Sequence, residues 1–137
     1  MRRWMWLIWL VASAVLVWAL SRGGWSVTLV FLALGLLFVA FWLSPWYGGS
    51  SLRHRDVMAL PEEERQRVVY WRPGDVFCTR FRGGLGRHAK ALLWVNVAQD
   101  REAEAFADER GEGAYPVVLV DGETLVNPDP RRVLELL

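Results

Sequence analysis

The stretch Val68–Lys90, VVYWRPGDVFCTRFRGGLGRHAK, decides the expected fold and contains the single cysteine of the chain. Residues 67–71 are β-branched or aromatic and predict a short strand, and a Pro-Gly turn follows. Asp75 is a good N-cap for the next helix, because its carboxylate can accept the backbone N–H of Cys78. One apolar face of this helix is expected to be buried, and it consists of Phe77, Cys78, Phe81 and Leu85.

The rest of the second half of the chain alternates strands and helices. The order is β-α-β-α-β-β-α, which predicts an α/β domain whose first two strands are parallel and joined by a helical crossover. The last two strands form a hairpin around Asp121-Gly122. Strands are expected at residues 67–71, 91–97, 116–120 and 124–126, and helices at 75–85, at 100–110 and after Asn127, which is expected to cap the last helix.

The N-terminal third is strongly apolar, in a chain that is 53% hydrophobic and has nine Trp. Residues 4–20 and 25–43 contain no charged side chain, and each is close to the ~17–25 residues needed to cross a bilayer. Two transmembrane helices are therefore expected, at about 4–20 and 25–43, joined by a tight turn. The expected organisation is a membrane hairpin at 1–47, a linker at 48–66 and a domain at 67–137.

The placement of arginines predicts the orientation of this hairpin. Arg2 and Arg3 precede the first apolar run, Arg53 and Arg55 follow the second, and only Arg22 lies between them. The positive-inside rule then places both termini in the cytoplasm of a multi-pass inner-membrane protein, with the lipid bilayer as its partner. A cleavable signal peptide is the alternative, but the first apolar run continues past the small-residue site and a second run follows.

Charge and cysteine content exclude several classes of function. The net charge is +1, and no Lys/Arg-rich run has interleaved aromatics, so a nucleic-acid partner is not expected. One cysteine excludes an intramolecular disulfide and a multi-cysteine metal site. His54 and His88 are too isolated for metal ligands and are expected at the surface.

Three segments resemble the glutaredoxin family. Residues 68–78 resemble its active-site segment, in which a strand leads to a C-x-x-C motif at a helix start. Residues 114–123 (AYPVVLVDGE) are similar to its cis-proline loop, at Tyr115-Pro116, and residues 126–130 (VNPDP) take the place where the family helps to bind its low-molecular-weight thiol. Residues 67–137 look most like the mycoredoxin-like glutaredoxins of actinobacteria. The resemblance implies a short thioredoxin fold and thiol–disulfide oxidoreductase activity, with mycothiol or glutathione as co-substrate and no bound cofactor.

The chain departs from the family at the chemistry. Asp75 stands where the family has its nucleophilic cysteine, and Cys78 matches the second, resolving position. A carboxylate cannot exchange disulfides, and its charge, together with burial, disfavours a thiolate at Cys78. The thiol-binding residues that the resemblance implies are Arg72, Tyr115, Pro116 and Asn127.

Three hypotheses for the function stay open at this point. The domain is a degenerate glutaredoxin that binds a thiol compound or a protein partner without turnover, a weak monothiol enzyme that uses Cys78, or a purely structural domain. We expect impaired or lost dithiol activity, with a non-catalytic interaction module as the alternative. The oligomeric state is left open by the sequence.

Overall fold

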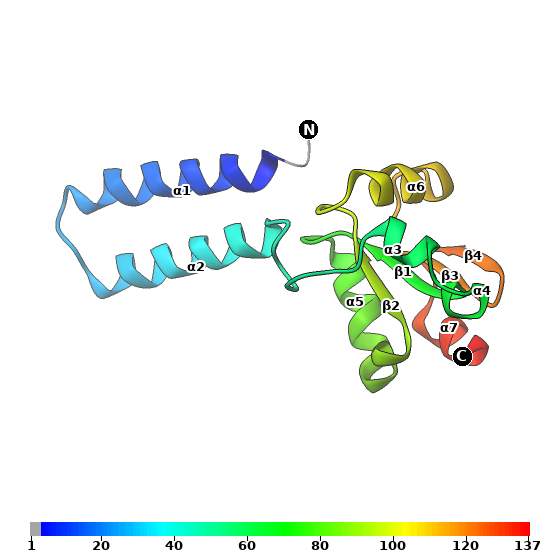
Figure 1. The fold of residues 1–137 in the computed structure, drawn as a ribbon. Helices are drawn as coiled ribbons and strands as arrows, with labels where there is room; N and C mark the ends of the chain where they lie inside the picture. The colour runs from blue at the N-terminus through cyan, green and yellow to red at the C-terminus, as the bar shows by residue number, and fades with distance from the viewer. Residues whose placement is uncertain (1–3) are drawn as a thin grey trace. The chain divides into compact units, whose positions relative to one another are not determined.

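The computed structural model describes residues 4–137 and divides into two compact units, with the boundary after Tyr47. In the first unit, α1 (Met5–Ser21) and α2 (Val27–Leu43) run side by side in opposite directions (Figure 1). The tight turn between them matches the prediction, since the N–H groups of Gly23 and Gly24 bond to the carbonyls at the end of α1 at 3.3 and 3.0 Å.

The prediction of two transmembrane helices, and with it the inner-membrane localisation, is wrong. Across residues 4–137 no helix combines the length and the apolar character that a membrane crossing requires. Each of the two helices has 17 residues, which is about 25 Å at 1.5 Å per residue and shorter than the hydrocarbon core. The apolar run at 25–43 overstated the second helix, because Ser26 caps it by accepting the N–H of Leu29 at 3.2 Å and Trp25 stays outside. Arg2 and Arg3, on which the orientation rested, lie outside the described residues.

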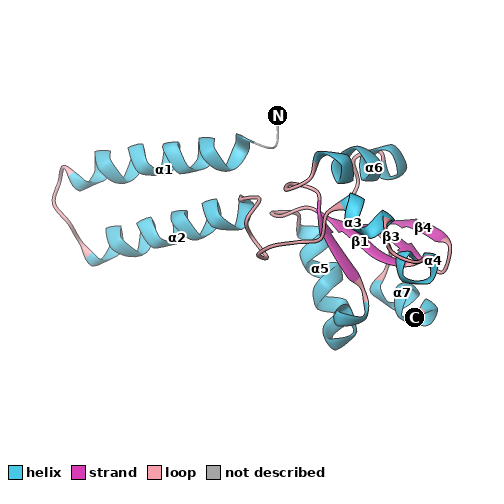
Figure 2. Cartoon of the chain, in the orientation of Figure 1, coloured by secondary structure: helices cyan, strands magenta, loops and turns pink. Residues whose placement is uncertain are grey.

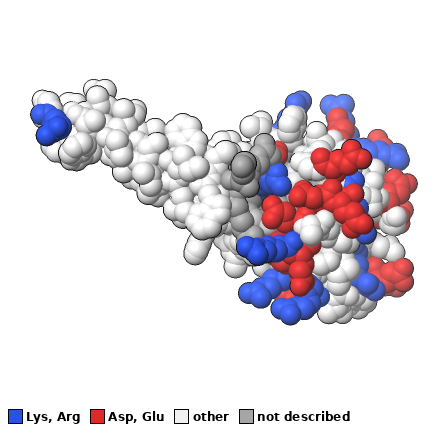
Figure 3. All heavy atoms as spheres, turned by 90° about the horizontal axis from the view of Figure 1, so that it is seen from above, with Lys and Arg blue, Asp and Glu red and all other residues white. Residues whose placement is uncertain are grey.

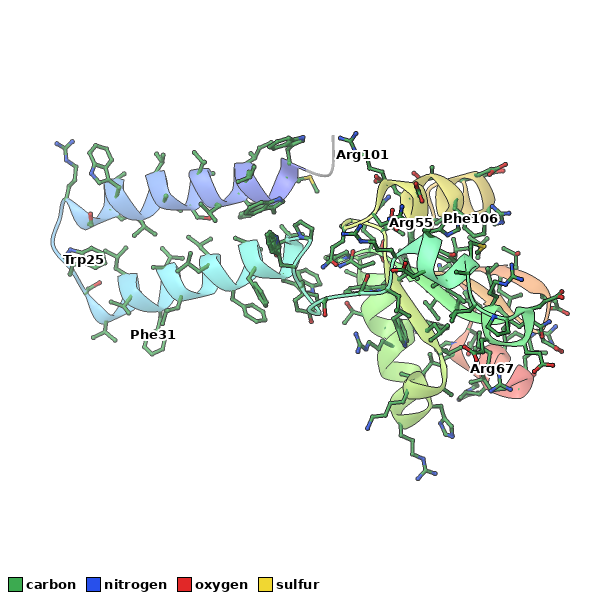
Figure 4. The ribbon with its side chains drawn as sticks, in the orientation of Figure 1. Trp25, Phe31, Arg55, Arg67, Arg101 and Phe106 are labelled. Carbon is green, nitrogen blue, oxygen red and sulfur yellow. The ribbon has the colours of Figure 1, made fainter. Side chains whose placement is uncertain are left out.

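Both helices are apolar all round. The side chains of Ser13, Leu29 and Ala40 are buried in this unit, whereas most of the large apolar side chains are exposed. Phe31, for example, is 71% exposed and points away from α1 (Figure 4). Charged groups are concentrated on the second unit instead (Figure 3).

The second unit is built on a four-stranded mixed sheet in the order β2-β1-β3-β4. β1 pairs in parallel with β2 and antiparallel with β3, and β3 pairs antiparallel with β4. The predicted order of elements and both predicted pairings are confirmed. The elements are α3 (His54–Met58), α4 (Glu62–Arg65), β1 (Arg67–Trp71), α5 (Val76–Leu85), the 3-10 helix η2 (Gly86–Ala91), β2 (Leu93–Asn96), α6 (Arg101–Gly111), β3 (Val117–Val120), β4 (Glu123–Val126) and α7 (Pro130–Leu136).

Helices cover both faces of this sheet. α5 and α7 pack together on one face, and α6 packs on the other against β3 and β4 (Figure 2). The strands supply a continuous apolar layer, because β1 and β3 are buried almost along their whole length. The largest fully buried side chains are Tyr70, Tyr115, Phe81 and Leu85.

Two details of the predicted helices are wrong. Phe77 is 55% exposed, so the buried face of α5 starts at Cys78 rather than one residue earlier. Asn127 does not cap α7, because Pro130 occupies the first turn and Asp129 accepts the N–H of Arg131 at 2.8 Å. Asn127 instead adopts a left-handed backbone with φ 45°.

Residues 48–66 are fastened to the domain at several points. The Oγ of Ser51 accepts the N–H of Asn96 at 3.0 Å, and the N–H of His54 donates to Asp100 Oδ2 at 2.7 Å. Val57 is completely buried. His54 was expected at the surface, but its Nδ1 lies 2.8 Å from the hydroxyl of the buried Tyr70. The burial of Val57 and these hydrogen bonds explain why α3 is held on the domain.

Two adjacent glycines of α5 test how α5 and α7 pack. A Cβ added at Gly84 would lie 2.5 Å from Pro130 Cγ, whereas one added at Gly83 would have no neighbour within 4 Å. Gly84→Ala is therefore expected to destabilise the protein by about 1–3 kcal/mol through overpacking. Gly83→Ala is expected to stabilise it by up to about 1 kcal/mol, because alanine favours a helix. Urea unfolding measures both variants, and equal effects would show that α7 is not packed on α5 in this way.

Candidate functional site

The candidate site lies where β1 ends and α5 begins. Asp75 is the N-cap of α5, as predicted, and its Oδ1 accepts the N–H groups of Phe77 at 2.8 Å and Cys78 at 3.2 Å. These donors at the positive end of the helix are the groups that stabilise a thiolate in a reactive cysteine site. Here a carboxylate that belongs to the chain occupies them.

Cys78 sits in the first turn of α5 and is only 3% exposed. Burial raises the pKa of its thiol from 9.0 to about 12, opposed by a backbone hydrogen bond from Arg72 and reinforced by the negative charge of Asp75. The thiolate is the reactive form of cysteine, so both burial and the shifted pKa make Cys78 a poor nucleophile.

Arg72 contacts the thiol of Cys78 through its backbone and contacts Tyr115, in the loop before β3, through its side chain. Its guanidinium lies 4.2 Å from the centre of the Tyr115 ring and 3.7 Å from Asp108, and Glu104 is 3.9 Å away. The hydroxyl of Tyr115 donates to Asp108 at 2.6 Å. Burial and this hydrogen bond raise the pKa of Tyr115. Arg72 and Tyr115 are thus both held by Asp108 of α6, and the guanidinium of Arg72 lies over the ring of Tyr115.

Pro116 and Asn127 lie next to each other and are joined by a backbone hydrogen bond. The Tyr115-Pro116 bond is cis, as the resemblance implied, and the carbonyl of Pro116 accepts the N–H of Asn127 at 2.8 Å. Asn127 also lines a groove of about 290 Å³ between α5 and the loop before α7. The groove is lined by Phe77, Arg80, Phe81, Asn127, Pro128, Asp129 and Pro130.

The sequence analysis did not predict that Arg80 and Phe77 line this groove. Arg80 is exposed and takes part in no ion pair within the described part of the chain, so its guanidinium is available to an anionic group in the groove. Phe77 presents an apolar ring beside it. Arg80 follows Asp75 by five residues, which places it on the second turn of α5. This spacing could have identified Arg80 from the sequence as a residue near the start of the helix.

The groove presents the guanidinium of Arg80, the amide of Asn127, the aromatic ring of Phe77 and the carboxylate of Asp129. A guanidinium and an amide can hydrogen-bond to an anionic or polar group, and an aromatic ring can pack on an apolar one. The one thiol of the chain is buried beneath the first turn of α5. No family model, no characterised protein and no solved structure is found to match the chain.

Proposed function

We propose that residues 67–137 form a glutaredoxin-like domain that has lost thiol–disulfide exchange and binds a low-molecular-weight thiol without turnover. The β-α-β-α-β-β-α order supports the assignment, as does the parallel pairing of β1 with β2. The observation that carries the loss of exchange is the pair of hydrogen bonds from the N–H groups of Phe77 and Cys78 to Asp75. With those donors taken and Cys78 buried, the domain has no exposed thiolate to attack a disulfide.

The groove beside Arg80 is the place where such a thiol would bind. A glutathione carboxylate would pair with the guanidinium of Arg80, and the apolar part of the ligand would lie on Phe77. Asn127 would supply amide donors from the opposite wall. Mycothiol has a sugar in place of the peptide carboxylates, so the strength of the Arg80 contact separates the two candidate thiols.

A protein partner is the second candidate occupant of this site. Val76 and Phe77 are 65% and 55% exposed, and they lie next to each other at the start of α5. An exposed apolar pair beside a groove is a feature of surfaces that hold a peptide or a protein. In this case the domain would dock an extended segment of the partner across α5 and the loop before α7.

Calorimetric titration of the full-length protein with glutathione and with mycothiol tests the binding. Arg80→Ala is expected to weaken glutathione binding by roughly tenfold or more, since a hydrogen bond to a charged group is lost. Arg82→Ala is the matched control, because Arg82 lies on the same helix but stacks on Trp94, 5.0 Å from the ring centre, and does not line the groove. Binding of neither thiol, or equal losses in both variants, would contradict the proposed ligand.

The exchange chemistry is tested at position 75. Asp75→Cys places a thiol where two backbone donors and the helix dipole stabilise a thiolate. We expect this thiolate to attack the disulfide of the oxidised low-molecular-weight thiol, which forms a mixed disulfide with the protein and releases one molecule of the reduced thiol. Intact mass after incubation with oxidised glutathione or mycothiol measures the adduct, with Asp75→Ser as the control. A wild-type adduct that disappears in Cys78→Ser would instead establish the weak monothiol enzyme.

A further inference from the structure

A second groove, of about 500 Å³, lies at the end of the sheet where β1 and β2 begin, away from Asp75. Its wall is mainly acidic: Glu63 and Glu64 come from α4 and Asp121 from the turn between β3 and β4, while Arg67 at the start of β1 adds one positive charge. All three carboxylates are exposed, and none takes part in an ion pair among residues 4–137. The remaining lining residues are Gln66, Ala91, Leu93 and Leu136, and Figure 4 marks Arg67.

A basic turn borders this acidic groove. η2 ends at Ala91, which itself lines the groove, and it exposes Arg87, His88 and Lys90. A 3-10 helix has three residues per turn, so Arg87 and Lys90 lie on the same side, roughly 6 Å apart along its axis. Neither has an ion-pair partner in the part of the chain that the structure describes.

The two surfaces have opposite charge, lie next to each other and do not pair within one chain. Under a two-fold axis, a patch made of two adjacent complementary halves becomes complementary to itself. The basic turn of each copy then meets the acidic groove of the other, and every favourable contact occurs twice. The net charge of the chain is only +1, so two copies repel each other weakly as they approach.

We propose that this end of the domain binds a second copy of the chain, with η2 of each copy placed in the acidic groove of the other. An unrelated acidic partner would bind the basic turn and leave the acidic groove empty. An unrelated basic partner would bind the groove and leave the turn without a partner. A second copy uses both surfaces. The apolar residues Ala91, Leu93 and Leu136 at the base of the groove are then covered as well.

Zero-length carbodiimide coupling of the full-length protein tests the contact directly. Lys90 is the only lysine of the chain, so a link between a lysine and a carboxylate reports on η2 alone. In a mixture of ¹⁴N and ¹⁵N protein, we expect peptides that join Lys90 of one isotope to Glu63 or Glu64 of the other. Lys90→Arg keeps the charge and removes the coupled amine, so it is the control. Association through any other surface gives no such mixed-isotope link, and that result would overturn the proposal.

Charge reversal is an independent test of the self-association, which is measured by energy transfer between two populations of the protein that carry different labels. Arg87→Glu with Lys90→Glu makes the turn acidic, and Glu63→Arg with Glu64→Arg makes the groove basic, so each variant is expected to lose self-association at least about fivefold. A mixture of the two variants is expected to associate again, because both contacts of the mixed pair are attractive. Unchanged self-association of either variant alone would overturn the proposal that a second copy occupies the groove. The same conclusion would follow if the wild-type chain does not self-associate and its groove binds an arginine-rich peptide.

Discussion

Carbamidomethylation of Cys78 in the folded protein is expected to proceed about a thousandfold more slowly near neutral pH than in the unfolded chain. The reaction needs the thiolate, and a pKa raised from 9.0 to about 12 lowers the thiolate fraction by that factor. Burial slows the reagent further, since only 3% of Cys78 is exposed. The cause is local: the thiol lies under the first turn of α5, and Asp75 adds a negative charge beside it.

Iodoacetamide labelling followed by intact mass measures this rate, in buffer and in concentrated urea. Asp75→Asn is the informative variant, because it keeps the helix cap and removes the charge, and we expect only a modest gain in rate since burial is the larger cause. A folded-state rate within tenfold of the unfolded rate would show that Cys78 is accessible. That result would favour a monothiol enzyme over a binding domain.

The free energy of unfolding is expected to fall by several kcal/mol as the pH rises from about 9 to 12. Burial raises the pKa of Tyr70 from 10.0 to about 12, and Cys78 and Tyr115 are shifted in the same direction. The folded chain therefore keeps protons that the unfolded chain releases in this window. Stability is complete below the unfolded pKa values and is lost as the pH climbs toward the folded ones, at about 1.4 kcal/mol per pH unit for each group.

Urea unfolding at a series of pH values from 8 to 11 measures this loss. Cys78→Ala removes one of the three groups, so its stability is expected to fall less steeply with pH than that of the wild type, even though its stability at pH 8 is lower. Tyr70→Phe is the second comparison, and it also removes the hydrogen bond to His54. Parallel curves for the wild type and both variants would mean that these groups are not protected by the fold.

The order of the elements was predictable because it depends on local patterns. The β-branched run of β1, the capping aspartate of α5 and the Asp121-Gly122 turn each involve residues close in sequence. The last of these has φ values of 49° and 76°, as a tight hairpin turn requires. Two of the three strand pairings followed from that order, since a helix between two strands favours a parallel pair and a tight turn an antiparallel one. The antiparallel pairing of β1 with β3 joins strands far apart in the sequence and was not predicted.

The failures of prediction occurred where a side chain depends on residues distant in sequence. Periodicity placed Phe77 on the buried face of α5, but at that position the neighbour is the groove in front of α7 and not the sheet. His54 looked isolated because its partners, Tyr70 and Asp100, lie 16 and 46 residues further along the chain. The apolar run at 25–43 failed for a local reason instead, because it counted Trp25 and Ser26, which precede the helix that Ser26 caps.

The sequence by itself determined the composition of the site: one cysteine, an aspartate three residues before it and a helix that begins between them. The tertiary structure decided how these groups behave. It buried the thiol of Cys78 and held Arg72 against Tyr115 and α6. The physical reason is that ionisation and reactivity depend on water and charge around a group, and these are set by residues that only the fold brings together.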